Sequence, residues 1–240
     1  MRAVRRAIIW DFEGTLGRRT PGAWSRCSIE VLDQHEPGHG VAFETIRPFL
    51  QSGFPWHSPS IPHPELSTSA AWWASVGARF ARAYEGVGFA PARAKELARL
   101  YRACYLDPQR WELFPETRSV LERARGSGVT SVILSNHVPE LGDILTLLEL
   151  DTLVDAVVNS AAIGYEKPHP ETFRLAREAA GDANDIWMIG DRYDVDIVGA
   201  EAAGIPAILV REGDPRANRY ASDLVEAFAM TEPSRPDVVP

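Results

Sequence analysis

The sequence has few cysteines and no long apolar run. Cys27 and Cys104 are the two cysteines among 240 residues. Two thiols are too few for a disulfide scaffold and have no metal-ligand spacing, so a reducing compartment is expected. No segment approaches the about 20 consecutive apolar residues that cross a bilayer, and the apolar run at 7–10 is too short for the centre of a signal peptide. These absences predict a soluble, cytoplasmic protein without a membrane partner.

Positive charge is also scarce. The chain carries 25 Lys and Arg against 33 Asp and Glu, a formal net charge of −8. A nucleic-acid-binding protein would show a basic face, so we expect no nucleic-acid partner. A small phosphorylated substrate is not excluded, because a bound metal and local donors can outweigh net charge. The oligomeric state is left open.

Short apolar segments alternate with amphipathic ones from residue 111 onward. Strands are predicted over 129–134, 156–158, 186–189 and 207–210, and helices over 116–125, 139–150, 170–180, 195–203 and 223–229. Together with a first strand over 7–10, this order predicts an α/β fold with a central parallel sheet between two helical layers. Residues 231–240 contain three prolines and are predicted to be a disordered tail.

The region from residue 17 to about 105 has a helical pattern instead. Helices are predicted over 24–34, 41–51, 67–85 and from Pro91 onward, and a loop with four prolines over 53–64. We interpret this region as a small helical unit inserted after the first strand. His57, Trp72 and Arg79 are candidates for contacting a substrate, although a structural role is favoured for each. His57 and His63 are interpreted as simple loop histidines rather than as a zinc pair, because no further ligand lies at a suitable spacing. His169, further along the chain, is interpreted as a loop residue without a role.

The first strand leads directly into acidic residues. Asp11 and Glu13 follow the buried run 7–10 and are two residues apart, so they face one side while the strand lasts. Gly14 permits a sharp turn, and Thr15 offers a hydroxyl to an anion. Because open α/β sheets bind ligands at the carboxyl edge of their strands, these residues mark a candidate site.

Two later stretches add groups that can hold a phosphate. Ser135 and Asn136 end the predicted strand 129–134, where a hydroxyl beside open backbone amides can bind phosphate oxygens. Lys167 precedes Pro168, which forces the lysine into an extended conformation. The alternative interpretation of Ser135 is that it simply caps the next helix. The alternative interpretation of Lys167 is a solvated surface charge.

The predicted strand 186–189 also runs into acids. Asp191 and Asp196 are five residues apart across a turn, with Asp194 between them. Crowded carboxylates repel one another unless a cation lies among them. Hard oxygen ligands with few histidines favour Mg²⁺.

Taken together, these stretches resemble the motif set of the haloacid dehalogenase-like hydrolase superfamily. The run from Asp11 to Leu16 is similar to the first motif of that superfamily. Ser135 stands at the position of the second motif and Lys167 at that of the third. The fourth corresponds to Gly190-Asp191 and continues to residue 196. The resemblance implies a Rossmann-like core made of 1–16 and 108–240, and a helical cap of the C1 type (subfamily I) over 17–107, called the insert below.

The resemblance also implies an activity and roles by position. It suggests a Mg²⁺-dependent phosphatase of small phosphorylated metabolites, with Asp11 as the nucleophile that forms an aspartyl-phosphate. Glu13 would be the general acid and base. Phosphoryl oxygens would be held by Ser135 and Lys167, with Thr15 and Asn136 as further substrate contacts.

The same resemblance implies a metal site. Its ligands would be Asp11, Asp191 and the backbone carbonyl of Glu13. Asp196 would act through a water molecule or orient Lys167. Phosphatases that this sequence resembles usually carry aspartate at the position of Glu13. The extra methylene of glutamate shifts the carboxyl group by ~1 Å. From the sequence alone, Glu13→Asp is expected to raise turnover.

Three alternatives remain. A 2-haloacid dehalogenase would use the same aspartate and suit Ser135-Asn136, but such enzymes carry tyrosine at position 13 and need no metal. A catalytically weak binding or regulatory protein is favoured by Glu13 alone. A phosphomutase shares all four motifs, but it would need a cap that admits a bisphosphate.

Overall fold

The computed structural model of the chain describes residues 4–20, 22 and 24–232. Within these residues, six strands form one parallel sheet in the order β5-β4-β1-β6-β7-β8. The strands are β1 (Arg6–Trp10), β4 (Thr130–Ser135), β5 (Ala156–Asn159), β6 (Asp185–Gly190), β7 (Ala207–Val210) and β8 (Tyr220–Ala221). The predicted α/β class with a central parallel sheet is confirmed.

Strand β1 lies at the centre of this sheet, between β4 and β6. Ile9 pairs with Val132 on one side and with Met188 on the other. Its last four residues are fully buried, as the apolar run predicts. Because all three strands run in parallel, the residues that follow them reach the same edge of the sheet.

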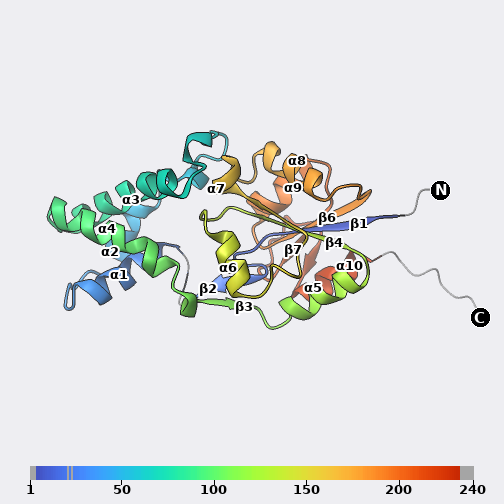
Figure 1. Cartoon of the computed structure of the whole chain (residues 1–240), viewed down its shortest axis with the longest axis horizontal. Coiled ribbons are helices and arrows are strands. Elements are labelled where there is room, and N and C mark those ends of the chain that lie inside the picture. The colour runs from blue at the N-terminus through green and yellow to red at the C-terminus, as the bar shows by residue number, and fades with distance from the viewer. Residues whose placement is uncertain (1–3, 21, 23, 233–240) are drawn as a thin grey trace, which may run out of the picture.

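Helices cover both faces of the sheet (Figure 1). Alternate residues of β1 enter two different cores, with Ile8 and Trp10 in one and Ala7 and Ile9 in the other. The first core also receives α5 (Thr117–Gly126), α6 (Leu141–Leu147) and α10 (Leu224–Met230). The second receives α8 (Pro170–Ala179) and α9 (Val198–Ala202). The period of two along β1 therefore builds a three-layer structure.

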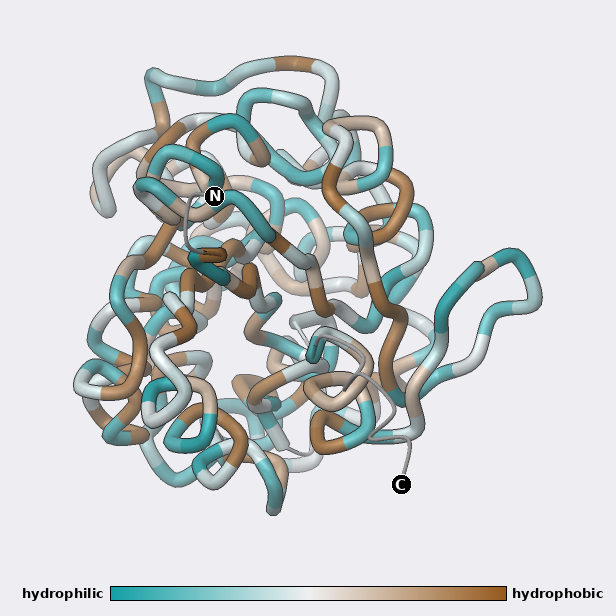
Figure 2. Tube along the Cα trace, turned by 90° about the vertical axis from the view of Figure 1, so that its right-hand side faces the viewer, coloured by the Kyte–Doolittle hydropathy of each residue, from teal (hydrophilic) through white to brown (hydrophobic). Residues whose placement is uncertain are grey.

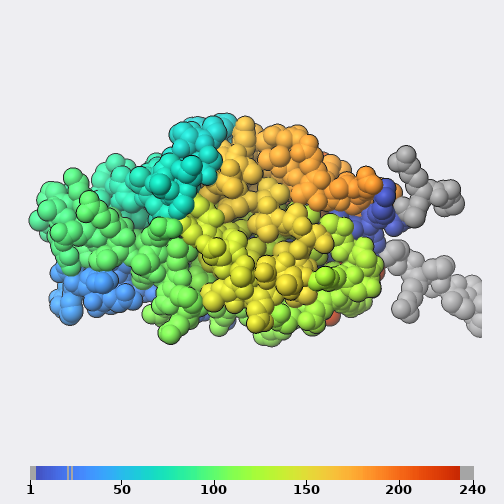
Figure 3. Space-filling model, in the orientation of Figure 1, coloured from blue at the N-terminus to red at the C-terminus, as the bar shows by residue number. Residues whose placement is uncertain are grey.

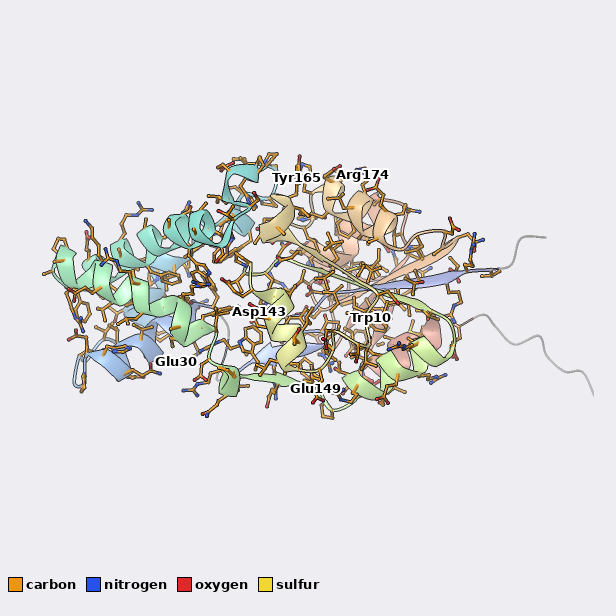
Figure 4. All side chains as sticks on the ribbon, viewed as in Figure 1. Trp10, Glu30, Asp143, Glu149, Tyr165 and Arg174 are labelled. Atoms are coloured by element: carbon orange, nitrogen blue, oxygen red, sulfur yellow. The ribbon has the colours of Figure 1, made fainter. Side chains whose placement is uncertain are left out.

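The insert forms a helical group at one end of the molecule (Figure 1). Its α-helices are α1 (Cys27–His35), α2 (Phe43–Ile46), α3 (Ser69–Gly86) and α4 (Pro91–Tyr105). Short 3-10 turns cover Trp24–Arg26, Arg47–Leu50, Pro55–His57 and Pro64–Leu66, and one more, Pro108–Arg110, follows α4. Figure 4 labels Glu30 on α1 and Trp10 in the sheet, which mark the two parts of the chain. The division into a core and a cap stays a prediction.

Several elements differ from the prediction. A short antiparallel ribbon joins the two parts, made of β2 (Gly17–Arg19) and β3 (Trp111–Leu113), and the sequence did not predict it. The predicted helix 41–51 is split, because Pro48 lies in a separate 3-10 turn. The predicted helix 195–203 begins as a π-helical turn, Tyr193–Ile197. The four-residue helix α7 (Ser160–Ile163) was also missed.

The predicted tail 231–240 falls mostly outside the described residues. Of its first residues, Thr231 is buried and accepts hydrogen bonds from the Arg6 guanidinium through its hydroxyl and its carbonyl. The structured part of the chain thus extends at least to this residue.

Figure 2 shows hydrophobic and hydrophilic stretches following each other closely along the trace. Across the described ranges, no helix combines the length and the apolar character that a bilayer crossing requires.

A buried contact between a histidine and a carboxylate joins the insert to the core. His63 Nε2 lies 3.1 Å from Glu166 Oε1, and the His63 amide donates to the Gly164 carbonyl at 2.8 Å. Both side chains of the pair are almost fully buried. Figure 3 shows the two segments packed against each other, the insert loop in teal and the core in yellow to orange. His63 lies in a loop, as predicted, and its side chain also ties this loop to the core.

Candidate active site

Asp11 follows β1 and lies at the meeting point of three strands. Its amide donates to the Ile189 carbonyl on β6 at 2.9 Å, which continues the sheet by one residue. Its Oδ1 accepts from Ser135 Oγ at 2.8 Å and from Lys167 Nζ at 2.7 Å. Three segments that are far apart in the sequence thus converge on one carboxylate, which is 5% exposed.

Lys167 is buried and held from several directions. Its ammonium donates to Asp11 Oδ1, to Asp196 Oδ1 at 2.7 Å and to the Leu134 carbonyl at 2.9 Å. Burial alone would lower the pKa of Lys167, but the carboxylates of Asp11 and Asp196 raise it above its ordinary value. Lys167 is therefore a fixed positive charge rather than a solvated surface group.

Asn136 fixes the backbone of Lys167. The Asn136 amide group donates to the Lys167 carbonyl at 3.0 Å, and its oxygen accepts from the Lys167 amide at 2.7 Å. The substrate contact from Asn136 stays a prediction, and these two bonds give the residue a supporting function. They hold the lysine loop against the end of β4.

Three carboxylates crowd beside this ammonium. Asp11, Asp191 and Asp196 each place one carboxylate oxygen in a group of three, and these oxygens lie within 4.8 Å of one another. Burial, together with the charge of Asp11, raises the pKa of Asp191, and burial raises the pKa of Asp196 although Lys167 opposes this. The cluster therefore carries unbalanced negative charge and could hold a metal ion.

Two glycines make room for these acids. A Cβ on Gly14, whose φ is +95°, would lie 2.3 Å from Asp191 Oδ2. A Cβ on Gly190 would lie 2.4 Å from the Asp196 carboxyl group. Glycine is thus required at both places for the carboxylates to reach their positions. Thr15, predicted to bind substrate, donates its hydroxyl to Asp191 Oδ1 at 3.3 Å in this structure.

Glu13 turns toward the insert. Its Oε2 accepts from the Tyr105 hydroxyl at the end of α4 at 3.4 Å, and lies 4.0 Å from His137 Nε2. Burial, followed by the charge of Asp11, raises the pKa of Glu13 to about 7. Burial lowers the pKa of His137 to about 4, so this imidazole is neutral at pH 7. A carboxyl group with a pKa near neutrality can both donate and accept a proton.

Some predicted groups lie elsewhere, and some were missed. Asp194 is exposed and pairs with Arg216 instead of joining the acids. His169 caps α8 by accepting from the Glu171 amide at 3.1 Å, so it does have a structural role. Tyr105 and His137 were not predicted, because tyrosine in a helix and histidine after a strand have no distinctive pattern. Their approach to Glu13 depends on the tertiary fold.

A cavity of about 640 Å³ extends from the acids toward the insert. Its core wall includes the carboxylates, Ser135 and Lys167, and its insert wall is rich in aromatic rings. Of the insert candidates, His57 and Trp72 line the cavity. Arg79 is not among the lining residues and donates to the carbonyl and hydroxyl of Ser75.

Comparison with known proteins places these features in one family. Residues 5–204 match the model of the haloacid dehalogenase-like hydrolases. The chain is 36% identical to the phosphoserine phosphatase of Thermus thermophilus, covering 94% of this chain and 91% of that protein. It is 30% identical to haloacid dehalogenase-like hydrolase domain-containing protein 3 of Mus musculus, covering 89% and 85%. Among solved structures, 2-haloacid dehalogenase from Pseudomonas syringae has the same fold, with a TM-score of 0.64, 20% identity and coverage of 95% and 98%.

Proposed function

The chain belongs to the haloacid dehalogenase-like hydrolase family and is a hydrolase, and on this premise we propose that it is a Mg²⁺-dependent phosphatase of small phosphorylated metabolites. The observation that carries the proposal is the contact of Asp11 with both Ser135 and Lys167 at the carboxyl edge of the sheet. A buried carboxylate with a hydroxyl and an ammonium around it is suited to attack phosphorus while its neighbours hold the phosphoryl oxygens.

In the first step, a free Asp11 oxygen attacks phosphorus and the bond to the leaving oxygen breaks. The product is an aspartyl-phosphate and the alcohol of the substrate. Glu13 in its protonated form gives its proton to the leaving oxygen, for which its pKa of about 7 is suitable. In the second step, Glu13 takes a proton from water, which attacks phosphorus, releases inorganic phosphate and restores Asp11.

Lys167 and Ser135 would offset the charge that develops on the phosphoryl oxygens. Asp196 holds Lys167 in place through the bond at 2.7 Å and also accepts from the Arg192 amide at 3.0 Å. We therefore assign Asp196 a positioning role toward the lysine, with any metal contact made through water. Because these donors are fixed before substrate binds, little reorganisation is needed in the transition state.

The residues fit a divalent cation of the hard type. Asp11, Asp191 and the carbonyl of Glu13 would hold Mg²⁺, since oxygen donors crowd there and burial raises the pKa of Asp191. The ion would supply positive charge to the phosphoryl group. In the same proposal, residues 17–107 act as a cap that excludes water from the core of 1–16 and 108–240, and the enzyme works in the cytoplasm.

Phosphatase activity is supported by the names of similar proteins, and the site itself disfavours two of the alternatives. The relative from T. thermophilus is named a phosphoserine phosphatase, and a ribulose-1,5-bisphosphate 5-phosphatase from Halopiger xanaduensis is 26% identical. A dehalogenase is disfavoured by the acid at Glu13 and by the carboxylate pair Asp191 and Asp196. A regulatory protein without activity is disfavoured because the contacts of Asp11 and Lys167 are complete.

The proposed function predicts metal-dependent release of phosphate. We expect the purified protein to hydrolyse members of a phosphomonoester panel with Mg²⁺ and to lose at least about 100-fold in rate with excess EDTA, because metal charge contributes several kcal/mol to such transition states. Restoring Mg²⁺ should restore the rate. Halide release from 2-chloropropionate that EDTA leaves unchanged would instead support the dehalogenase.

The contact of Glu13 with Tyr105 predicts a further result and revises the expectation from sequence. An aspartate at position 13 would be ~1 Å shorter and would lose the Tyr105 hydroxyl, so we expect Glu13→Asp and Tyr105→Phe each to lower kcat/KM for alkyl phosphates by about tenfold. Because kcat/KM reports the steps up to release of the alcohol, its loss should be small with p-nitrophenyl phosphate, whose leaving group departs without a proton.

These two kinds of substrate distinguish a defect in proton transfer from a general loss of structure. An equal loss with both would contradict the positioning of Glu13 by Tyr105. An increase in turnover for Glu13→Asp would show that the site accepts the shorter acid.

A further inference from the structure

The insert wall of the cavity is built from aromatic rings. Trp24 lies at the centre, with ring centroids 5.0 Å from Trp56, 5.6 Å from Trp72 and 4.9 Å from Tyr105. All four residues line the cavity whose other end holds Asp11. A substrate with its phosphoryl group at Asp11 would therefore extend its leaving group toward these rings.

The charged groups that the insert contributes to this wall already have partners. Arg18 Nε donates to Glu112 at 2.7 Å. Arg19 makes two hydrogen bonds to Glu30, at 2.7 and 2.8 Å, and its charge is thereby balanced.

The remaining polar groups of this wall carry no charge. Burial lowers the pKa of His57, so its imidazole is neutral at pH 7. Among the described residues, no carboxylate of the insert lines the cavity, and the two insert positions left undescribed nearby are Pro21 and Ala23. The insert side therefore offers neither a free cation nor an anion to a leaving group.

From this wall we propose that the leaving group of the substrate is uncharged and carries a flat, largely apolar ring. The inference rests on the proposed function, because it assumes that a phosphomonoester binds with its phosphoryl group at Asp11. A flat ring would bury apolar surface against the tryptophan side chains. It could pack against them in a stacked or an edge-to-face arrangement. An ammonium or carboxylate in the same place would lose its hydration without gaining a partner.

The core contributes one exposed cation at the edge of the cavity, Arg192. It could receive a carboxylate from a substrate such as phosphoserine, which is the substrate that the relative's name gives. Phosphoserine therefore provides the most informative competitor to a ring-bearing substrate. The two kinds of substrate would use different walls of the same cavity.

The test compares phosphomonoesters that share a primary alkoxide leaving group. With the full-length enzyme and Mg²⁺, we expect kcat/KM for 2-phenylethyl phosphate to exceed that for 2-aminoethyl phosphate and for O-phosphoserine by about 30-fold. Trp56→Leu should reduce this ratio by about tenfold, and Trp56→Phe, which keeps a ring, should largely retain it. Trp187→Leu is the matched control, because Trp187 lies outside the cavity, and it should leave the ratio unchanged.

Equal rates for the three esters, or faster cleavage of either charged ester, would overturn the inference while leaving phosphatase activity established. If no ester were cleaved, the proposed function would fail, and binding would then decide the inference separately. Calorimetry with 2-phenylethylphosphonate and 2-aminoethylphosphonate serves this purpose. Tighter binding of the aromatic phosphonate supports the aromatic wall, and equal binding overturns it.

Discussion

Asp11→Asn is expected to lower kcat by about 10⁴-fold or more, with the folded structure retained. The amide oxygen is a poor nucleophile, and the covalent step requires a carboxylate. The contact with Ser135 Oγ can be kept by the amide oxygen, and Lys167 keeps its bond to Asp196. The measurement is phosphate release in steady state, together with thermal unfolding of the variant.

Asp143→Asn is the matched control for this loss. Asp143 is exposed on α6, where Figure 4 labels it, and it lies outside the cavity. The same chemical change should leave kcat unaffected there. A variant of Asp11 that kept a tenth or more of the wild-type rate would mean that another group attacks phosphorus.

Lys167→Met is expected to remove activity and to destabilise the protein as well. The substitution would leave the buried Asp11 and Asp196, beside the half-buried Asp191, without a counter-charge, and removing one partner of a buried ion pair costs about 3–5 kcal/mol. Equilibrium unfolding in urea without metal measures this cost. Mg²⁺ should recover part of the lost stability, because a divalent cation among the acids offsets their repulsion.

The chain offers a matched control for this variant too. It contains two lysines, and the other, Lys95, is exposed on α4. Lys95→Met should change the free energy of unfolding little, as is usual at exposed positions. Similar stabilities for the two methionine variants would contradict the view that Lys167 balances the buried acids.

The sequence predicted the fold well where local pattern and burial agree. The run 7–10 is apolar throughout, which is typical of a strand covered on both faces, and it is the central strand β1. Glycine and proline also mark real boundaries, since α4 begins at Pro91 and α8 at Pro170. Helix 41–51 failed because Pro48 interrupts it after one turn.

The candidate site was predictable in part for the same reason. Asp11, Ser135 and Gly190 follow or end parallel strands, so topology alone brings them to one edge. Tyr105 could not be predicted to reach Glu13, because its position depends on how the insert packs against the core. The contacts between the insert and the core join residues far apart in the sequence, such as the ribbon pair Gly17 with Leu113 and the contact of His63 with Glu166.

Trapping the phosphorylated enzyme tests the central claim most directly. The enzyme is mixed with a substrate that it turns over, quenched in acid within one turnover and treated with borohydride, which reduces an acyl phosphate on aspartate to homoserine. Peptide mass spectrometry then locates the change. We predict homoserine at position 11 in the wild-type protein and none in Asp11→Asn. Reduction at a different carboxylate would contradict the assignment of Asp11 as the nucleophile.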